Sequence, residues 1–179
     1  MIHRKPLFNF VLSTLFIGSL LLIAACSDDE PDAQSLEGDY TFVSAELRKD
    51  IIVDGNTIPA GTDISDQISA GLFGAVSCTN PDNTAINLES GGTLFFFCVG
   101  ETAVTPVQAG TWSGTNNNTN LVLALSSPPF PSPLSATVKG LTLDGAIMSG
   151  YMTGLPVPGE LFGSSGLYII DFNIVFEKQ

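Results

Sequence analysis

A cysteine near the N-terminus stands where its thiol could take part in a covalent reaction. Cys26 follows residues 22–25 (LIAA), which close an uncharged apolar stretch that begins at Leu7 after a basic segment. A positive segment, an apolar segment and small residues before a cleavage point are the marks of a secretory signal peptide. A thiol at that point is a nucleophile that can carry a diacylglycerol. The sequence therefore predicts a signal peptide over residues 1–25 and a lipidated Cys26.

The same segment resembles the lipobox of bacterial lipoproteins, in which an aliphatic residue and two small residues precede the lipid-bearing cysteine. The resemblance implies a diacylglycerol and an N-acyl chain such as palmitate on Cys26, no other cofactor, and a membrane as partner. Two or three chains, at about 0.8 kcal/mol per buried methylene, make a stable anchor. One alternative is a transmembrane helix, since residues 7–25 are about long enough to span a bilayer. The other is a core cysteine that happens to follow two alanines.

The residues after Cys26 bear on where the protein is anchored. Residues 26–37 are acidic, polar and interrupted by Pro31, which is typical of a disordered tether. Residues 27–30 (SDDE) also resemble the export signal of surface lipoproteins in Bacteroidota-type bacteria. That resemblance implies a lipid-anchored protein of the outer membrane displayed at the cell surface. The alternative is a solvated spacer, with the protein on the periplasmic leaflet.

The composition excludes several classes of function. The chain has 18 Asp and Glu against six Lys and Arg, and Arg4 and Lys5 belong to the predicted signal peptide. A chain of this charge is repelled by phosphate backbones, so we expect no nucleic-acid partner. The single histidine, His3, also lies in the signal peptide, which excludes a Ser-His-Asp or Cys-His nucleophile. Carboxylate pairs such as Asp63 with Asp66 are expected to be solvated, and we predict no catalytic residue and no enzyme activity.

Cys78 and Cys98 remain as a pair once Cys26 carries lipid. In an oxidising compartment such a pair indicates a disulfide. Closing a loop of about 20 residues should stabilise the fold by roughly 3 kcal/mol. The alternative is two buried free thiols. We predict no metal site, because the mature chain lacks histidine and two cysteines supply half of a tetrahedral zinc shell.

The elements that must position these residues are nearly all strands. Turn signals recur about every 8 to 12 residues, which is typical of a sandwich or barrel. In the first strand we expect Tyr40 and Phe42 on one face and Val43, Ala45 and Leu47 on the other. Strands are expected over residues 38–47, 84–89, 93–99, 107–115, 121–125, 134–143, 146–153 and 167–177.

Two short elements interrupt the series of strands. Residues 51–58 are expected to form a hairpin, because Asp-Gly at 54–55 suits a type I′ turn. Residues 64–76 carry apolar side chains at helical spacing, Ile64, Ile68 and Leu72 among them, and predict a short helix. Its apolar face must rest on other residues, so we expect it to act as a plug or lid at one end of a barrel.

Three short motifs resemble the lipocalin-like lipoproteins of the calycin group. Residues 36–40 (LEGDY) are similar to the Leu-x-Gly-x-aromatic start of that family, although Tyr40 stands where Trp is most frequent. The cysteine pair flanks residues 83–88 (NTAINL), and residues 110–112 (GTW) are similar to the family's Gly-x-Trp strand. The resemblance covers Leu36 to Gln179. It implies an all-β domain over residues 38–179, an antiparallel up-and-down barrel of about eight strands.

Non-catalytic binding is the class of function that we expect. A barrel of about eight strands is wide enough to be filled by side chains or to hold one small ligand. Phe95, Phe97, Trp112 and Phe172 are the candidates to line a pocket for a small apolar ligand. The alternative is that these side chains fill the barrel.

A second hypothesis concerns two apolar, uncharged segments rich in proline. Residues 128–131 contain Phe130, and residues 155–158 begin at Leu155. Exposed apolar patches often mark partner sites, and proline loops lower the entropic cost of a contact. Under this alternative the protein is a structural or adaptor surface lipoprotein with a filled barrel, and the two loops bind another envelope protein.

Overall fold

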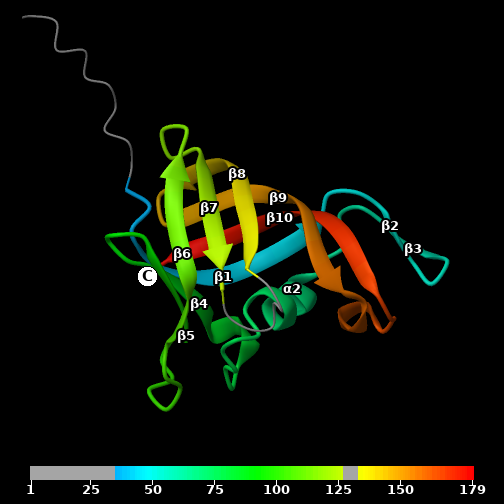
Figure 1. The fold of residues 1–179 in the computed structure, drawn as a ribbon, viewed down its shortest axis with the longest axis horizontal. Helices are drawn as coiled ribbons and strands as arrows, with labels where there is room; N and C mark the ends of the chain where they lie inside the picture. The colour runs from blue at the N-terminus through cyan, green and yellow to red at the C-terminus, as the bar shows by residue number, and fades with distance from the viewer. Residues whose placement is uncertain (1–34, 127–132) are drawn as a thin grey trace, which may run out of the picture. The chain divides into compact units, whose positions relative to one another are not determined.

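The computed structural model describes residues 35–126 and 133–179 (Figure 1). The predicted signal peptide, the predicted lipidation site Cys26 and the loop residue Phe130 lie outside these residues.

Eight antiparallel strands close into one barrel in the described part of the chain. Their order around the barrel is β1-β10-β9-β8-β7-β6-β5-β4, so neighbours in sequence pair with each other and β1 closes the ring against both β10 and β4. The predicted all-β, lipocalin-like barrel is confirmed. The strands are β1 (Gly38–Leu47), β4 (Thr84–Leu88), β5 (Thr93–Cys98), β6 (Val107–Thr115), β7 (Asn120–Leu125), β8 (Leu134–Asp144), β9 (Ile147–Pro158) and β10 (Leu167–Lys178).

The faces predicted for β1 are wrong in its second half. The register of β1 against β10 shifts next to Phe42, where Val43 is an extra residue on β1. A bulge of this kind sets two residues against one on the partner strand, so the side chains that follow it change face. Ala45 and Leu47 are consequently buried on the same side as Tyr40 and Phe42, while Val43 is 49% exposed.

Two short elements of the first half lie outside the ring of strands. Strands β2 (Ile51–Val53) and β3 (Asn56–Ile58) pair as a separate hairpin. Its turn has positive φ at Asp54 and Gly55 (49° and 80°), as a type I′ turn requires. Helix α2 (Ser65–Leu72) lies within the predicted range of 64–76 and across one opening of the barrel (Figure 1). Two 3₁₀ turns complete the description, η1 (Pro81–Asn83) and η2 (Gly159–Phe162).

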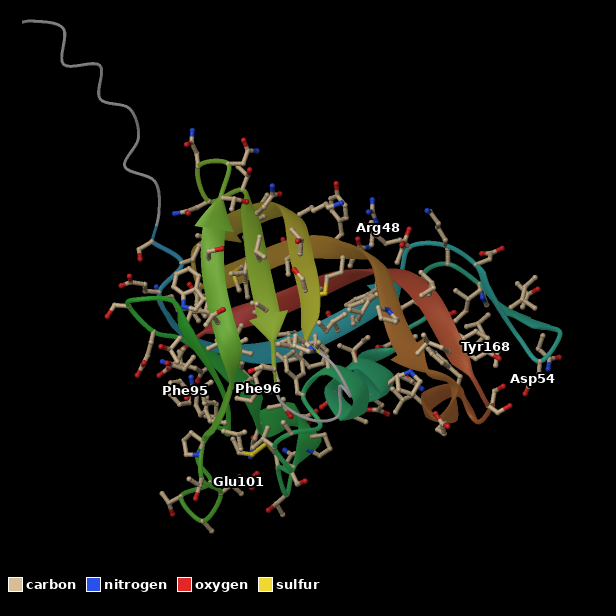
Figure 2. The ribbon with its side chains drawn as sticks, in the orientation of Figure 1. Arg48, Asp54, Phe95, Phe96, Glu101 and Tyr168 are labelled. Carbon is tan, nitrogen blue, oxygen red and sulfur yellow. A yellow bond between two sulfur atoms is a disulfide. The ribbon has the colours of Figure 1, made fainter. Side chains whose placement is uncertain are left out.

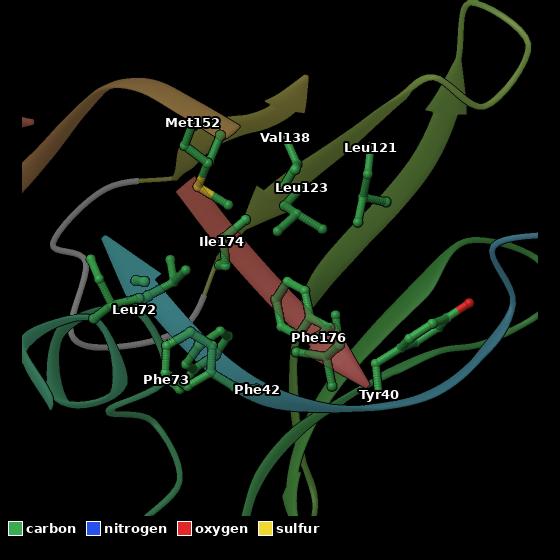
Figure 3. Packing of buried hydrophobic residues seen from close by; sticks show 14 of the residues in the cluster. Tyr40, Phe42, Leu72, Phe73, Leu121, Leu123, Val138, Met152, Ile174 and Phe176 are labelled. Atoms are coloured by element: carbon green, nitrogen blue, oxygen red, sulfur yellow. The ribbon is translucent and has the colours of Figure 1, made fainter. Parts of the chain in front are cut away.

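An aromatic cluster joins the helix to the barrel interior. Phe73, directly after α2, is 1% exposed. The centroid of its ring lies 5.3 Å from that of Phe42 and 6.3 Å from that of Phe176, as the reader can follow in Figure 3. It lies 5.1 Å from the centroid of Phe96. These four residues are called the aromatic cluster below. Because Phe73 comes from outside the strands and contacts three of them, the helix is packed into the barrel as a plug.

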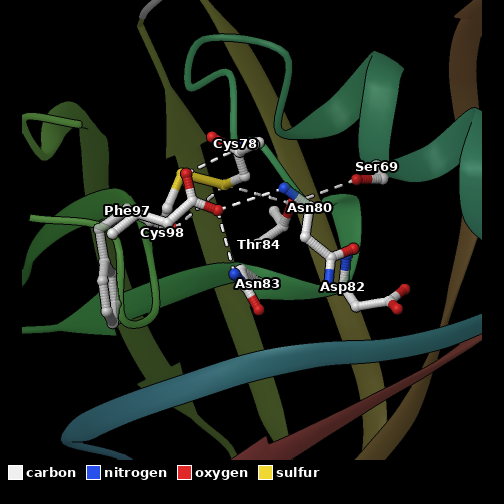
Figure 4. The surroundings of a disulfide bond; sticks show 10 residues. Ser69, Cys78, Asn80, Asp82, Asn83, Thr84, Phe97 and Cys98 are labelled. Carbon is white, nitrogen blue, oxygen red and sulfur yellow. Dashed lines mark hydrogen bonds between the residues drawn. A yellow bond between two sulfur atoms is a disulfide. The ribbon is translucent and has the colours of Figure 1, made fainter. Parts of the chain in front are cut away.

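The predicted disulfide between Cys78 and Cys98 is confirmed (Figure 4). It joins the loop after α2 to the end of β5. The carboxylate of Glu101 holds the same loop, since it accepts hydrogen bonds from the backbone N–H groups of Thr79 (2.9 Å) and Asn80 (3.2 Å) and from Asn83 Nδ2 (3.0 Å). These bonds hold the pKa of Glu101 down at about 2.

Candidate functional site

Strand β5 presents its phenylalanines to two different environments. Leu94, Phe96 and Cys98 are buried in the barrel core, whereas Phe95 and Phe97 alternate with them and are half-buried on the outer face. Figure 2 labels Phe95 and Phe96 on this strand. Successive side chains of a strand point to opposite faces of the sheet. The prediction that Phe95 and Phe97 line the barrel interior is therefore wrong, and Phe96 takes that place. A role for Phe95 and Phe97 in binding stays a prediction, now on the outer wall.

The two outward phenylalanines border a hollow of about 330 Å³ on the outer wall of the barrel. Strand register explains the grouping, because Asp39 on β1 lies opposite Asn87 on β4, and Asn87 lies opposite Phe95 on β5. Three adjacent strands thus contribute one row of side chains to a single surface. The residues of this outer hollow are Asp39, Asn87, Glu89, Phe95, Phe97 and Pro106.

Hydrogen bonds fix the polar side of the outer hollow. Asn87 Nδ2 donates to Asp39 Oδ1 at 2.5 Å, which ties β4 to β1 across the outer face. The backbone carbonyl of Glu89 accepts from the indole Nε1 of Trp112 at 2.9 Å and from the backbone N–H of Gly92 at 3.1 Å. Two hydrogen bonds to one carbonyl oxygen therefore hold the main chain at Glu89 in place.

Phe172 lies in the barrel core and Trp112 packs against it, and neither lines the outer hollow. Trp112 pairs with Leu123 on β7 and packs, partly buried, against the core. Its single donor is used by the Glu89 carbonyl. Phe172 on β10 is fully buried. The structure thus brings Phe95 and Phe97 together and separates both from Trp112 and Phe172.

Leu155 does not lie in an exposed loop, as the sequence suggested, but in strand β9. It is 5% exposed and pairs with Ile170 on β10. Residues 155–158 are the last part of β9, and all four pair with residues of β10. Leu155 also lines a second hollow of about 170 Å³ between β8 and β9, beyond the point where Lys139 pairs with Tyr151. The prediction that residues 155–158 form an exposed partner-binding loop is therefore wrong.

The barrel interior also contains a polar group, the hydroxyl of Tyr40. Tyr40 is fully buried, and its hydroxyl has no hydrogen-bond partner among the residues that the structure describes. Burial raises the pKa of this phenol above its ordinary value. A buried donor without a partner is costly, so Tyr40 marks a place where the core is polar.

The remaining observations limit the chemistry of the described residues. Within residues 35–126 and 133–179, no group of three or more His, Cys, Asp or Glu side chains is placed to hold a metal ion. Asp63 accepts hydrogen bonds from the backbone N–H and the hydroxyl of Ser65 at the start of α2, which lower its pKa. No helix in the same residues is long and apolar enough to cross a bilayer. No protein-family model and no curated protein matches the chain.

Proposed function

We propose that the protein is a lipid-anchored, extracytoplasmic binding protein that holds a small ligand in the outer hollow without catalysing a reaction. The observation that carries the proposal is the position of Phe95 and Phe97, two half-buried aromatic side chains that border one hollow of about 330 Å³. Small-molecule sites are typically hollows of about 300–1,000 Å³ with apolar walls and a few polar groups. The outer hollow has this composition.

Packing favours the outer wall over the barrel interior as the place of binding. The aromatic cluster occupies the opening that α2 covers, and Phe73 is 1% exposed. Protein cores are packed as densely as organic crystals. A ligand that entered past α2 would have to displace Phe73 from three ring contacts, whereas a ligand in the outer hollow displaces no core side chain.

The sequence supports the anchoring part of the proposal. Cys26 follows a signal-like segment, and lipid on this residue would tether the barrel to the outer membrane, at the cell surface or on the periplasmic leaflet. The disulfide between Cys78 and Cys98 fits an oxidising compartment. Metabolic labelling with an alkyne-tagged palmitate tests the anchor, since the label should appear in the wild type and be lost in Cys26→Ser. A labelled Cys26→Ser protein would contradict it.

Native mass spectrometry of the full-length protein, extracted in a neutral detergent, tests the binding part. We expect a bound mass that denaturation releases. The double variant Phe95→Ala/Phe97→Ala should lose this mass. The matched control Ile169→Ala, which removes an aliphatic side chain that is 62% exposed on β10, should keep it. A bound mass that survives in the double variant would place the ligand elsewhere, and a wild type without bound mass would contradict the proposal.

Docking of another envelope protein is the second candidate function. Ile52, Leu167 and Ile169 are 67%, 64% and 62% exposed. Exposed aliphatic groups of this kind are used in protein contacts when they form a patch. Crosslinking in intact cells separates the candidates, because Ile169→Asp should abolish a partner adduct that Phe97→Ala leaves unchanged. An adduct that resists Ile169→Asp would argue against this surface.

A further inference from the structure

The charged groups of the outer hollow have one sign. Asp39 and Glu89 contribute carboxylates, and none of its other described residues is basic. Tyr40, the residue after Asp39, pairs with the basic residue Lys178 on β10. Lys178 directs its ammonium nitrogen to the backbone carbonyl of Glu37 at 3.1 Å and lies over the ring of Tyr40. Lys178 therefore places its positive charge at Glu37 and Tyr40 and does not line the outer hollow.

The polar atoms that the outer hollow offers are mainly acceptors. Carboxylates accept hydrogen bonds and donate none when ionised. Asn87 carries the side-chain N–H groups of the hollow, and one N–H of its Nδ2 donates to Asp39. The Asn87 amide oxygen adds a further acceptor. A ligand that matches this set must bring donors or positive charge.

The apolar part of the outer hollow also suits a cation. Phe95 and Phe97 are two positions apart on the same face of β5, which separates their Cα atoms by about 7 Å. The faces of aromatic rings attract ammonium and guanidinium groups. An anion would be repelled by Asp39 and Glu89. Calcium binds six or more oxygen ligands, whereas the described residues contain no group of three or more His, Cys, Asp or Glu side chains placed to hold a metal ion.

We propose that the ligand of the outer hollow is an organic cation, an ammonium group with a compact apolar body. This inference rests on the proposed function, since it names the class of ligand for the same site. The ammonium group lies near the carboxylates of Asp39 and Glu89 and against the ring faces of Phe95 and Phe97, which the apolar body also contacts. The overall formal charge of −12 favours the approach of such a ligand.

Two probes of equal shape test the proposal. Choline is a quaternary ammonium, and 3,3-dimethylbutan-1-ol is its neutral carbon isostere. Each is titrated into the full-length protein in an uncharged detergent, and binding is followed by NMR through the Asn87 side-chain amide and the β4–β5 backbone amides. We expect choline to bind at least about three-fold more tightly than the isostere. Added salt should weaken choline binding and leave that of the isostere unchanged.

Variants locate the effect. Glu89→Gln should weaken choline binding about three-fold while leaving the isostere unaffected. Phe97→Leu, which stays apolar but loses the aromatic face, should also weaken it. Asp144→Asn removes an equal charge from the exposed β8–β9 turn and should change nothing. Equal binding of both probes at the outer hollow would overturn the cation class and leave the binding function standing. Shifts absent from the outer hollow with both probes would overturn both proposals.

Discussion

Phe73 meets Phe96 edge-to-face, with ring centroids 5.1 Å apart and ring planes at 81°. Phe73 belongs to the segment after α2, and Phe96 is an inward residue of β5 whose two neighbours, Phe95 and Phe97, border the outer hollow. One strand therefore supports the plug on its inner face and the proposed ligand site on its outer face. The packing of the core and the shape of the candidate site depend on the same short segment of chain.

Truncating Phe73 should destabilise the whole barrel. Phe73→Ala removes a buried ring with three aromatic contacts, and we expect the free energy of unfolding to fall by about 3–5 kcal/mol. Urea denaturation followed by circular dichroism measures this change. Ile169→Ala, at an exposed position, should change it by less than about 0.5 kcal/mol. A similar loss for both variants would mean that the plug contributes little.

Glu101 should make the disulfide loop sensitive to acid. The folded-state pKa of about 2 is below the ordinary value of 4.5, so ionised Glu101 stabilises the fold. This contribution is complete above about pH 4.5 and is lost as the pH falls through about 2. Hydrogen exchange at the Thr79 and Asn80 amides should therefore accelerate between pH 4.5 and pH 2 in the wild type, after correction for the intrinsic rate. In Glu101→Gln the protection should already be low and independent of pH in this range.

Reducing the disulfide should lower stability without abolishing the fold. The bridge closes a loop with a sequence separation of 20 residues, and the double variant Cys78→Ala/Cys98→Ala should lose roughly 3 kcal/mol. Denaturation of the wild type with and without dithiothreitol should give the same difference. The double variant should not respond to the reductant. An unchanged midpoint would show that the Glu101 hydrogen bonds alone hold the loop.

Gly110 should tolerate no side chain. Its φ is +154°, and a Cβ atom there would overlap the backbone carbonyl of Ala124 on β7. Gly110→Asn should therefore disrupt the β6–β7 ladder and lower the melting temperature by several degrees at least. Gly145→Asn is the matched control, since Gly145 has φ of +60° in open space and Asn adopts that conformation readily. Equal melting temperatures for the two variants would contradict the overlap.

Local signals in the sequence were sufficient for most of the fold. The first strand and the 51–58 hairpin have the expected bounds, because β-branched residues and an Asp-Gly turn determine them locally. The disulfide was predicted from the oxidising compartment and from the pair of cysteines that remains once Cys26 carries lipid. The prediction failed after Val43, since a bulge leaves no mark in the apolar pattern and reverses every later side chain.

The outer hollow could not have been found from pattern alone. Residues 94–98 are all apolar, so alternation does not reveal which side chains face inward. The packing of Leu94 and Cys98 in the core decides it. Asp39 and Asn87 are 48 positions apart and meet only because β1 pairs with β4. A carboxylate, an amide and two aromatic rings therefore become one surface through register, which single-sequence reasoning does not supply.

The pairing of β1 with both β4 and β10 bears on the order in which the barrel can close. Tyr40 pairs with Ile86 on one side and with Lys178 on the other. When the chain emerges with its N-terminus first, β1 and β4 can pair early. The other edge of β1 then stays open until β10 arrives. Contacts so distant in sequence are slow to form, and an open strand edge invites pairing with foreign strands. We therefore expect closure to be the last and most vulnerable step of folding, and a factor that shields the edge of β1 to protect the protein until β10 arrives.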